Sequence, residues 1–329
     1  MHDRPVTFSK NVFLPLTTVC RNRCGYCGFW TPVQEGCLMA PDEVDRILKT
    51  GAALGCTEAL FTFGERPEED PGFPAVIHAA GFRTILDYCL AMCKTSIGYG
   101  ILPHTNAGIL SIDEMERLHA VNASMGLMLE TTARVPAHRG SKGKEPEVRL
   151  TMIEDAGKLK IPFTTGLLLG IGERMADREE SLLAIRDIHR RYGHIQEIII
   201  QNFCPKPGTP MAAAPVPRTD EICGTIQMAR EILPEEIAVQ IPPNLIDASR
   251  LLACGVDDLG GVSPLTIDYV NPEHPWPAVE ELRRLAGARG IRERLCIYPR
   301  FIEKGWYHPD LEPLINRLAQ TVYGRCSGP

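Results

Sequence analysis

Three cysteines close together carry the strongest chemical signal in the sequence. Cys20, Cys24 and Cys27 stand in a Cys-x-x-x-Cys-x-x-Cys spacing directly after an apolar run, Val12–Val19. Three thiolates on one short loop ligate three irons of a 4Fe–4S cluster and leave the fourth iron without a protein ligand. A structural zinc site takes four ligands, usually as two separated pairs, and this stretch offers three. We therefore expect an iron–sulfur cluster here, with zinc or unliganded buried thiols as the alternatives.

The other cysteines give a weaker signal. The chain has 12 cysteines in 329 residues, and those outside the cluster are scattered. At this density they do not form a disulfide framework, and nothing marks the chain as secreted. Cys89 and Cys93 lie four apart in a helical pattern, where we expect them to pack as small apolar side chains.

Composition excludes several function classes. The chain has a net charge of −6, with 44% hydrophobic and 23% charged residues. A mildly acidic chain has no general attraction for nucleic acid or anionic membranes. Its longest apolar stretch, Leu167 to Ile171, is too short to span a bilayer, and residues 1–5 lack the apolar core of a signal peptide. We expect a soluble, cytoplasmic protein that binds neither nucleic acid nor membrane.

Short apolar runs alternate with segments of helical periodicity along the chain. The expected strands are Val12–Val19, Ala59–Phe63, Ser96–Leu102, Ser124–Leu129, Phe163–Leu169, Glu197–Gln201, Ala238–Ile241 and Val256–Leu259. The expected helices are Asp42–Leu54, Ala75–Met92, Asp113–Ala120, Glu147–Leu159, Ser181–Arg191 and Asp220–Ile232.

Eight strands without hairpins predict a parallel sheet closed into a (β/α)8 barrel of the TIM type. An open doubly wound sheet is the alternative. It would need a glycine-rich phosphate turn after the first strand, where the cysteine loop stands instead.

The pattern changes near residue 265 and becomes rich in proline between 271 and 277. We expect residues 1–264 to form the barrel and residues 265–329 to form a wrapping segment and a final helix pair of the same domain. Chemistry in such barrels lies on the loops at the carboxyl ends of the strands. Polar residues at those ends are therefore the candidates for the site.

With Tyr26 as its aromatic residue, the Cys-x-x-x-Cys-x-aromatic-Cys loop resembles the signature of radical S-adenosylmethionine (SAM) enzymes. The resemblance implies that Cys20, Cys24 and Cys27 bind a 4Fe–4S cluster whose open iron chelates SAM. An electron from the cluster then cleaves SAM into methionine and a 5′-deoxyadenosyl radical.

Other strand ends match the same family. Gly64-Glu65 resembles the motif that holds the methionine amine of SAM. Glu130 and Arg149 resemble the acid that binds the ribose and the arginine that binds the methionine carboxylate, a role suited to the arginine fork. The segment from Gly166 to Glu173 resembles the fifth-strand motif, with Leu168 against the adenine. For Glu65 and Arg149 the alternative is a solvated surface residue.

Segments outside the cysteine loop indicate which family within the radical SAM enzymes the chain resembles. They are similar to the CofG family, the single-cluster subunits of 7,8-didemethyl-8-hydroxy-5-deazariboflavin synthase, over about residues 8 to 308. The matching segments are 8–17, 58–67, 201–210, 241–245, 260–264 and 271–277. Gly28 departs from the Thr or Ser that commonly follows the third cysteine.

This resemblance implies one step of deazaflavin coenzyme synthesis. A CofH-type radical SAM partner supplies an adduct of a hydroxybenzyl group with a ribitylaminouracil. This chain then abstracts a hydrogen atom and closes the ring with loss of ammonia, as a lyase-type synthase. A low-potential donor, ferredoxin or flavodoxin, supplies the electron.

A ribityl-uracil substrate needs neutral hydrogen-bonding groups at the barrel mouth. The strand ends offer Asn106, Asn202, Asn244 and Asp258 as substrate contacts and His104 as a candidate catalytic proton shuttle. For each of them, a structural polar role is the alternative. The general base is not identified by the sequence.

Two other functions stay open. One is a radical SAM enzyme of the same branch, either a menaquinone-pathway cyclase or a biotin-synthase-like sulfur inserter. A sulfur inserter would need a second cluster, for which the remaining cysteines lack tight spacing. The other is a non-catalytic protein, either an iron–sulfur electron carrier or a zinc-stabilised binding barrel.

Overall fold

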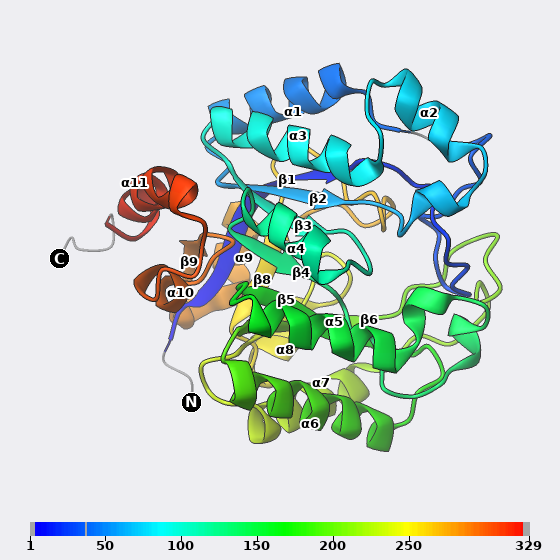
Figure 1. The fold of residues 1–329 in the computed structure, drawn as a ribbon. Coiled ribbons are helices and arrows are strands. Elements are labelled where there is room, and N and C mark those ends of the chain that lie inside the picture. Colours follow the sequence, from blue (N-terminus) through cyan, green and yellow to red (C-terminus); the bar gives the residue numbers. More distant parts are fainter. Residues whose placement is uncertain (1–3, 37, 325–329) are drawn as a thin grey trace.

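The computed structural model describes residues 4–36 and 38–324. Parallel strands β1 to β8 follow one another around a closed barrel, because β1 pairs with both β2 and β8 (Figure 1). The strands are β1 (Val6–Pro15), β2 (Glu58–Thr62), β3 (Leu102–Asn106), β4 (Ser124–Gly126), β5 (Phe163–Leu169), β6 (Ile195–Asn202), β7 (Ala238–Gln240) and β8 (Asp258–Val262). The expected (β/α)8 barrel is confirmed.

Helices cover the outside of the barrel. They are α1 (Pro41–Ala53), α2 (Phe73–Ala79), α3 (Ile85–Gly98), α4 (Ile112–His119), α5 (Pro146–Lys158), α6 (Met175–Tyr192), α7 (Thr219–Ile232) and α8 (Ala248–Leu252). Local signals set several starts: Ser111 and Glu114 form a capping box on α4, and proline opens α1 and α5. Among residues 4–36 and 38–324, no helix is long and apolar enough to cross a bilayer.

Three strand predictions were wrong in position. The first strand runs from Val6 to Pro15 and not from Val12 to Val19. Ser96–Leu102 was expected as a strand, but helix α3 continues to Gly98 and β3 begins at Leu102. The apolar residues there are the buried face of the helix and not a strand. The eighth strand runs from Asp258 to Val262 and not from Val256 to Leu259, so Gly260 and Gly261 belong to the strand and not to a turn after it.

The C-terminal segment closes the end of the barrel at which the strands begin. It contains α9 (Val279–Ala286), β9 (Ile291–Arg294), α10 (Pro299–Glu303) and α11 (Glu312–Tyr323). Strand β9, which the sequence did not predict, pairs with the first half of β1 in parallel. Figure 1 shows α10 and α11 on the side from which β1 starts. Their apolar residues pack with Leu102 and Ala123, which lie at the entry to β3 and just before β4.

The stretch before α9 crosses the other end of the barrel. The Thr266 hydroxyl accepts a hydrogen bond from the Phe13 N–H (2.9 Å), and Tyr269 stacks on the Phe13 ring with centroids 5.8 Å apart. The Asn244 amide donates to the His274 carbonyl (3.1 Å). The expected wrapping segment therefore contacts the mouth of the barrel, and the elements after it contact the floor.

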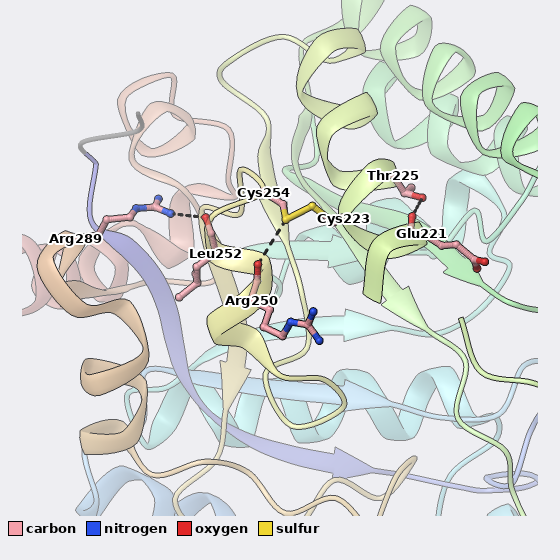
Figure 2. The surroundings of a disulfide bond; sticks show 7 residues. All are labelled: Glu221, Cys223, Thr225, Arg250, Leu252, Cys254 and Arg289. Carbon is pink, nitrogen blue, oxygen red and sulfur yellow. Dashed lines mark hydrogen bonds between the residues drawn. A yellow bond between two sulfur atoms is a disulfide. The ribbon is translucent and has the colours of Figure 1, made fainter. Parts of the chain in front are cut away.

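One disulfide joins two of the scattered cysteines. Cys223 on α7 is bonded to Cys254 in the turn after α8, with Cα atoms 5.5 Å apart (Figure 2). Arg289, in the turn before β9, donates to the carbonyl of Leu252 in the same region (3.3 Å). The scattered cysteines were not expected to form a disulfide framework, and within the described residues the structure pairs these two.

Candidate functional site

The cysteine loop leaves the end of β1 and is held by two neighbouring parts of the barrel mouth. The Arg21 N–H donates to the Glu65 carbonyl after β2 (2.8 Å), and the Gly25 N–H donates to the Ala137 carbonyl after β4 (2.7 Å). The Arg23 N–H donates to the Ser141 hydroxyl (3.0 Å). The loop is therefore held at its start and at its middle by contacts distant in sequence.

Cys20, Cys24 and Cys27 line a cavity of about 290 Å³ at the carboxyl ends of the strands. The same cavity is lined by residues from the ends of β2, β3 and β4, and by one residue of α5. The predicted site residues among them are Tyr26, Gly64, Glu65, Asn106, Glu130 and Arg149. The structure thus brings together most of the side chains that the sequence singled out.

The end of β2 passes very close to the cysteine loop. A Cβ at Gly64 would lie 2.0 Å from the Val19 carbonyl oxygen and 2.8 Å from the Cys20 Cβ, so only glycine fits. The next residue, Glu65, is 4% exposed, and its backbone N–H donates to Cys20 Sγ (3.2 Å). The Gly64-Glu65 pair therefore joins the second strand to the first cysteine.

Two groups of the protein donate hydrogen bonds to the Glu65 carboxylate. Arg21 Nε donates to Oε1 (2.7 Å), and the Ile109 N–H donates to Oε2 (3.1 Å). This excludes the solvated loop carboxylate that the sequence left open.

Glu130 lies at the centre of the opposite wall. It adopts a left-handed backbone (φ 68°) after β4, which turns its side chain toward the cysteine loop. The carboxylate accepts from the Tyr26 hydroxyl, lies 2.8 Å from His138 Nε2 and contacts the Lys144 ammonium. Burial alone would raise the pKa of Glu130, but Lys144, Arg149 and His138 hold this pKa well below its usual value. Glu130 is therefore ionised in a buried place.

Arg149 is a buried cation facing the same cavity. It is 3% exposed, donates to the Met128 carbonyl and lies 3.7 Å from Glu130 Oε1. Its Nε has no hydrogen-bond partner within the described part of the chain. A buried donor without a partner carries a free-energy penalty that an anionic ligand would relieve. The alternative of a surface arginine is wrong.

The thiols fit ligation of a cluster. Cys20 Sγ accepts backbone N–H groups from Asn22 (3.4 Å) and Glu65 (3.2 Å), contacts that stabilise a thiolate. Burial raises the pKa of the Cys20 and Cys24 thiols, so binding iron displaces their protons. Within residues 4–36 and 38–324, no three His, Cys, Asp or Glu side chains are arranged to hold a single metal ion.

Leu168 is set back from the cavity. It packs in a small apolar cluster with Val135, Ile171 and Phe203, against which Tyr26 also packs. In the same motif, Glu173 accepts the N–H groups of Gly170 and Ile171 (both 2.9 Å) and closes its own turn. A contact between Leu168 and a ligand stays a prediction.

The five candidate substrate and proton-transfer residues lie in three different places. His104 and Asn106 point into the barrel, where His104 Nε2 lies 3.2 Å from Asn106 Oδ1. Asn202 donates to the Leu245 carbonyl (3.3 Å) and Asn244 to Asp268 (2.9 Å), so both tie loops together. The expected position of Asp258 at the mouth is wrong, because it is the first residue of β8 and pairs with Arg294 at the floor (2.6 Å).

Sequence reasoning missed Arg21, His138 and Lys144. Arg21 lies inside the cysteine loop, and its contact with Glu65 arises only in the folded chain. His138 and Lys144 come from the irregular segment between β4 and α5, which has no periodicity to mark them. No sequence signal pointed to their contacts with Glu130.

Comparisons with known proteins agree with this geometry. Residues 14–185 match the family model described as the Radical SAM superfamily. The chain is 70% identical to a 7,8-didemethyl-8-hydroxy-5-deazariboflavin synthase from Methanoregula boonei, covering 100% of both chains. It is 68% identical to the protein of the same name from Methanoculleus marisnigri, covering 98% of this chain and 97% of that one.

Solved structures share the fold. Methylornithine synthase (PylB) superposes with a TM-score of 0.66 at 15% identity, covering 95% of this chain and 86% of that one. The hydrogenase maturase HydG superposes with a TM-score of 0.70 at 15% identity, covering 97% of this chain and 69% of that one.

Proposed function

The chain belongs to the radical SAM superfamily and, within it, to the family of 7,8-didemethyl-8-hydroxy-5-deazariboflavin synthases, and on this premise we propose that it closes the deazaflavin ring. The substrate is 5-amino-5-(4-hydroxybenzyl)-6-(D-ribitylimino)-5,6-dihydrouracil. Conversion to 7,8-didemethyl-8-hydroxy-5-deazariboflavin removes ammonia and two hydrogen atoms. SAM accepts the two electrons and ends as methionine and 5′-deoxyadenosine.

One observation carries this proposal: the three cysteines, Glu65, Glu130 and Arg149 line a single cavity. When bound at the cysteines, a 4Fe–4S cluster supplies the electron that cleaves SAM and so creates the hydrogen-abstracting fragment. Every other contribution comes from the chain itself, which binds the cosubstrate, orients it and keeps water from the reacting atoms.

We assign the SAM contacts by charge and reach. Arg149 offers its unpartnered Nε to the methionine carboxylate, and Glu65 accepts from the methionine amine. Glu130 accepts from the ribose hydroxyls. Because burial and the Glu130 carboxylate raise the pKa of Tyr26 well above its usual value, the phenol stays protonated and keeps Glu130 in place. Gly64 allows the close approach, and Leu168 supports the adenine.

The partners, the compartment and the domain limits are part of the same proposal. A CofH-type enzyme supplies the adduct, and ferredoxin or flavodoxin supplies the electron in the cytoplasm. The barrel of residues 1–264 and the segment 265–329 act as one domain, which is supported by the contact of β9 with β1.

The test is an anaerobic incubation of the reconstituted protein with SAM, dithionite and the hydroxybenzyl-uracil adduct. We expect 5′-deoxyadenosine and the fluorescent deazaflavin to form together. With tyrosine and the ribitylaminouracil in place of the adduct, product should form only after the CofH-type partner is added. SAM cleavage without deazaflavin would contradict the proposal and favour a menaquinone-type cyclase.

A further inference from the structure

A second cavity lies deeper in the barrel, below the site. It has a volume of about 70 Å³ and shares Asn106, Thr164 and Ile199 with the cavity that the cysteines line. The two cavities therefore meet at these three residues. Because a water molecule needs about 10–15 Å³ of such volume, the deeper cavity has room for several hydroxyl-sized groups.

Seven of the eleven residues that line this lower cavity are polar. At this depth the interior of a closed barrel is normally filled by branched apolar side chains. Here the polar lining residues are Glu58, His104, Asn106, Thr164, Glu197, Gln240 and Arg294. They come from β2, β3, β5, β6, β7 and β9. The polar residues therefore form a layer across the barrel and are not confined to one strand.

Glycines on the neighbouring strands make room for the amide groups of this layer. A Cβ at Gly126 would lie 2.3 Å from Asn106 Oδ1, and a Cβ at Gly261 would lie 2.1 Å from Asn11 Nδ2. Gly261 itself lines the lower cavity. The amides therefore pack directly against the glycine backbone, where any larger residue would displace them.

Asn11 on β1 lies beside the lower cavity, against Gly261, without being part of its lining. Its side chain is 1% exposed, and neither Oδ1 nor Nδ2 has a hydrogen-bond partner among the residues that the structure describes. Buried amides are almost always hydrogen-bonded, because leaving them unpaired lowers stability. An amide that rests on a cavity-lining glycine with both atoms unpaired indicates a ligand with donors and acceptors.

The charges indicate a neutral ligand with many hydroxyl donors. Arg294 is the one cation in the lining, and it is paired with Glu197 (2.7 Å) and with Asp258 (2.6 Å). Within the part of the chain that the structure describes, the third carboxylate, Glu58, accepts a side-chain hydrogen bond only from the neutral Ser9 hydroxyl. An anion would meet an excess of carboxylates here, whereas hydroxyl groups would find acceptors.

We propose that the lower cavity binds the ribityl chain of the substrate, with its hydroxyls on Asn11, Glu58, Gln240 and the other polar groups of the layer. This inference rests on the proposed function. An unbranched polyol matches a small cavity lined by many polar groups. Its attachment point then holds the uracil and hydroxybenzyl rings in the upper cavity beside Asn106. The specificity for a ribityl substrate would thus be set at the floor of the site, away from the cluster.

The test compares two substrates in matched variants. The adduct is used beside an analogue in which an n-pentyl chain replaces the ribityl chain, and the ratio of their kcat/KM values is measured. The wild type should strongly prefer the ribityl adduct. In Asn11→Leu and in Gln240→Met this ratio should fall by about 5- to 10-fold, the effect of a lost neutral hydrogen bond or two.

Asn122→Leu is the control. Asn122 is equally buried but hydrogen-bonds the Leu118 carbonyl (2.9 Å) and the Thr105 hydroxyl (2.7 Å), outside both cavities. It should lower Tm and leave the ratio unchanged, whereas Asn11→Leu should lower the ratio without lowering Tm. A wild type that converts both substrates equally well, or variants that keep the wild-type ratio, would overturn the inference alone. A wild type that converts neither would overturn the proposed function.

Discussion

At the scale of single residues, Glu130 shows how the site depends on contacts between distant parts of the chain. Its carboxylate meets Tyr26 from the cysteine loop, Lys144 from the loop before α5 and Arg149 from α5 itself. The cations offset the desolvation of a buried carboxylate and keep it charged. A charged acceptor of this kind is suited to the hydroxyls of a ribose.

The cysteine ligands can be tested one at a time. Replacing Cys20, Cys24 or Cys27 by Ala should remove most of the bound iron and all SAM cleavage, because a cluster with two protein ligands is not retained. The wild type should carry about four irons per chain. Cys204→Ala is the control, since Cys204 is partly exposed and lies outside the cavity lining. Anaerobically purified protein with zinc and no acid-labile sulfide would contradict the assignment.

The planar guanidinium group of Arg149 gives a second prediction. Arg149→Lys should weaken SAM binding by about 10- to 150-fold, because an ammonium loses one or more charged hydrogen bonds of about 1.5–3 kcal/mol. Iron content should not change. Arg178→Lys is the matched control. Arg178 is also buried, but its partner is Glu173 (2.7 Å) in the turn after β5, and neither residue lines the cavity. Normal SAM affinity in Arg149→Lys would remove this residue from the site.

The sequence predicted the residues whose signal is local. Three cysteines on one loop, and a Gly-Glu pair at a strand end, can be recognised without the fold. Arg149 was identified only by resemblance, and its burial followed from the structure. Lys144, His138 and the floor residues Glu197 and Arg294 could not be predicted, because their roles arise from tertiary contacts that no spacing encodes.

At the scale of elements, the errors of the sequence analysis have two causes. Helix α3 and strand β3 form a nearly continuous apolar stretch, and periodicity alone does not show where the helix ends. Strand β9 is short and polar, with the sequence Ile-Arg-Glu-Arg, so it lacks the pattern of a strand. It forms because β1 extends below β2 and presents a free edge to it.

The junction of β2 with the cysteine loop gives an element-scale prediction. Gly64→Ala would push a Cβ into the Val19 carbonyl and the Cys20 side chain, so the loop and the strand end must move apart. We expect the variant to lose iron on purification more readily than the wild type. In Gly224→Ala on α7, a Cβ meets nothing within 4 Å, and stability should rise by about 0.5–1 kcal/mol. A Gly64→Ala protein with full iron content would show that the close approach is not needed.

The floor of the barrel gives a prediction about pH. Burial, with Asp258 nearby, raises the pKa of Glu197 to about 7, although Arg294 opposes the shift. The folded protein then holds this proton more tightly than the unfolded chain, whose glutamate has a pKa of about 4.3. Its contribution to stability is full below the unfolded pKa and is lost as pH rises toward 7.

Between pH 5 and pH 7.5, Tm should therefore fall more steeply in the wild type than in Glu197→Gln. The glutamine keeps the shape of the protonated acid but does not titrate, while the other titrating groups are common to both proteins. Parallel Tm curves over this range would contradict the raised pKa.

At the scale of the whole molecule, the C-terminal segment contributes lining residues to both the upper and the lower cavity. Val270 lines the upper cavity, and Arg294 and Cys296 line the lower one. A barrel of strands β1 to β8 without this segment would be open at its floor. The closed fold was predictable from the alternation of strands and helices, whereas the return of residues 291–323 to the floor was not, because it depends on packing against Leu102 and Ala123.

The central claim is that one cluster in one cavity initiates one radical reaction for each ring closed. The direct test is the ratio of 5′-deoxyadenosine to deazaflavin when SAM is limiting and the adduct is in excess. The account predicts one of each per SAM consumed, because SAM is the two-electron acceptor and is not regenerated. Many deazaflavin molecules per SAM, or two molecules of 5′-deoxyadenosine per ring under tight coupling, would contradict it.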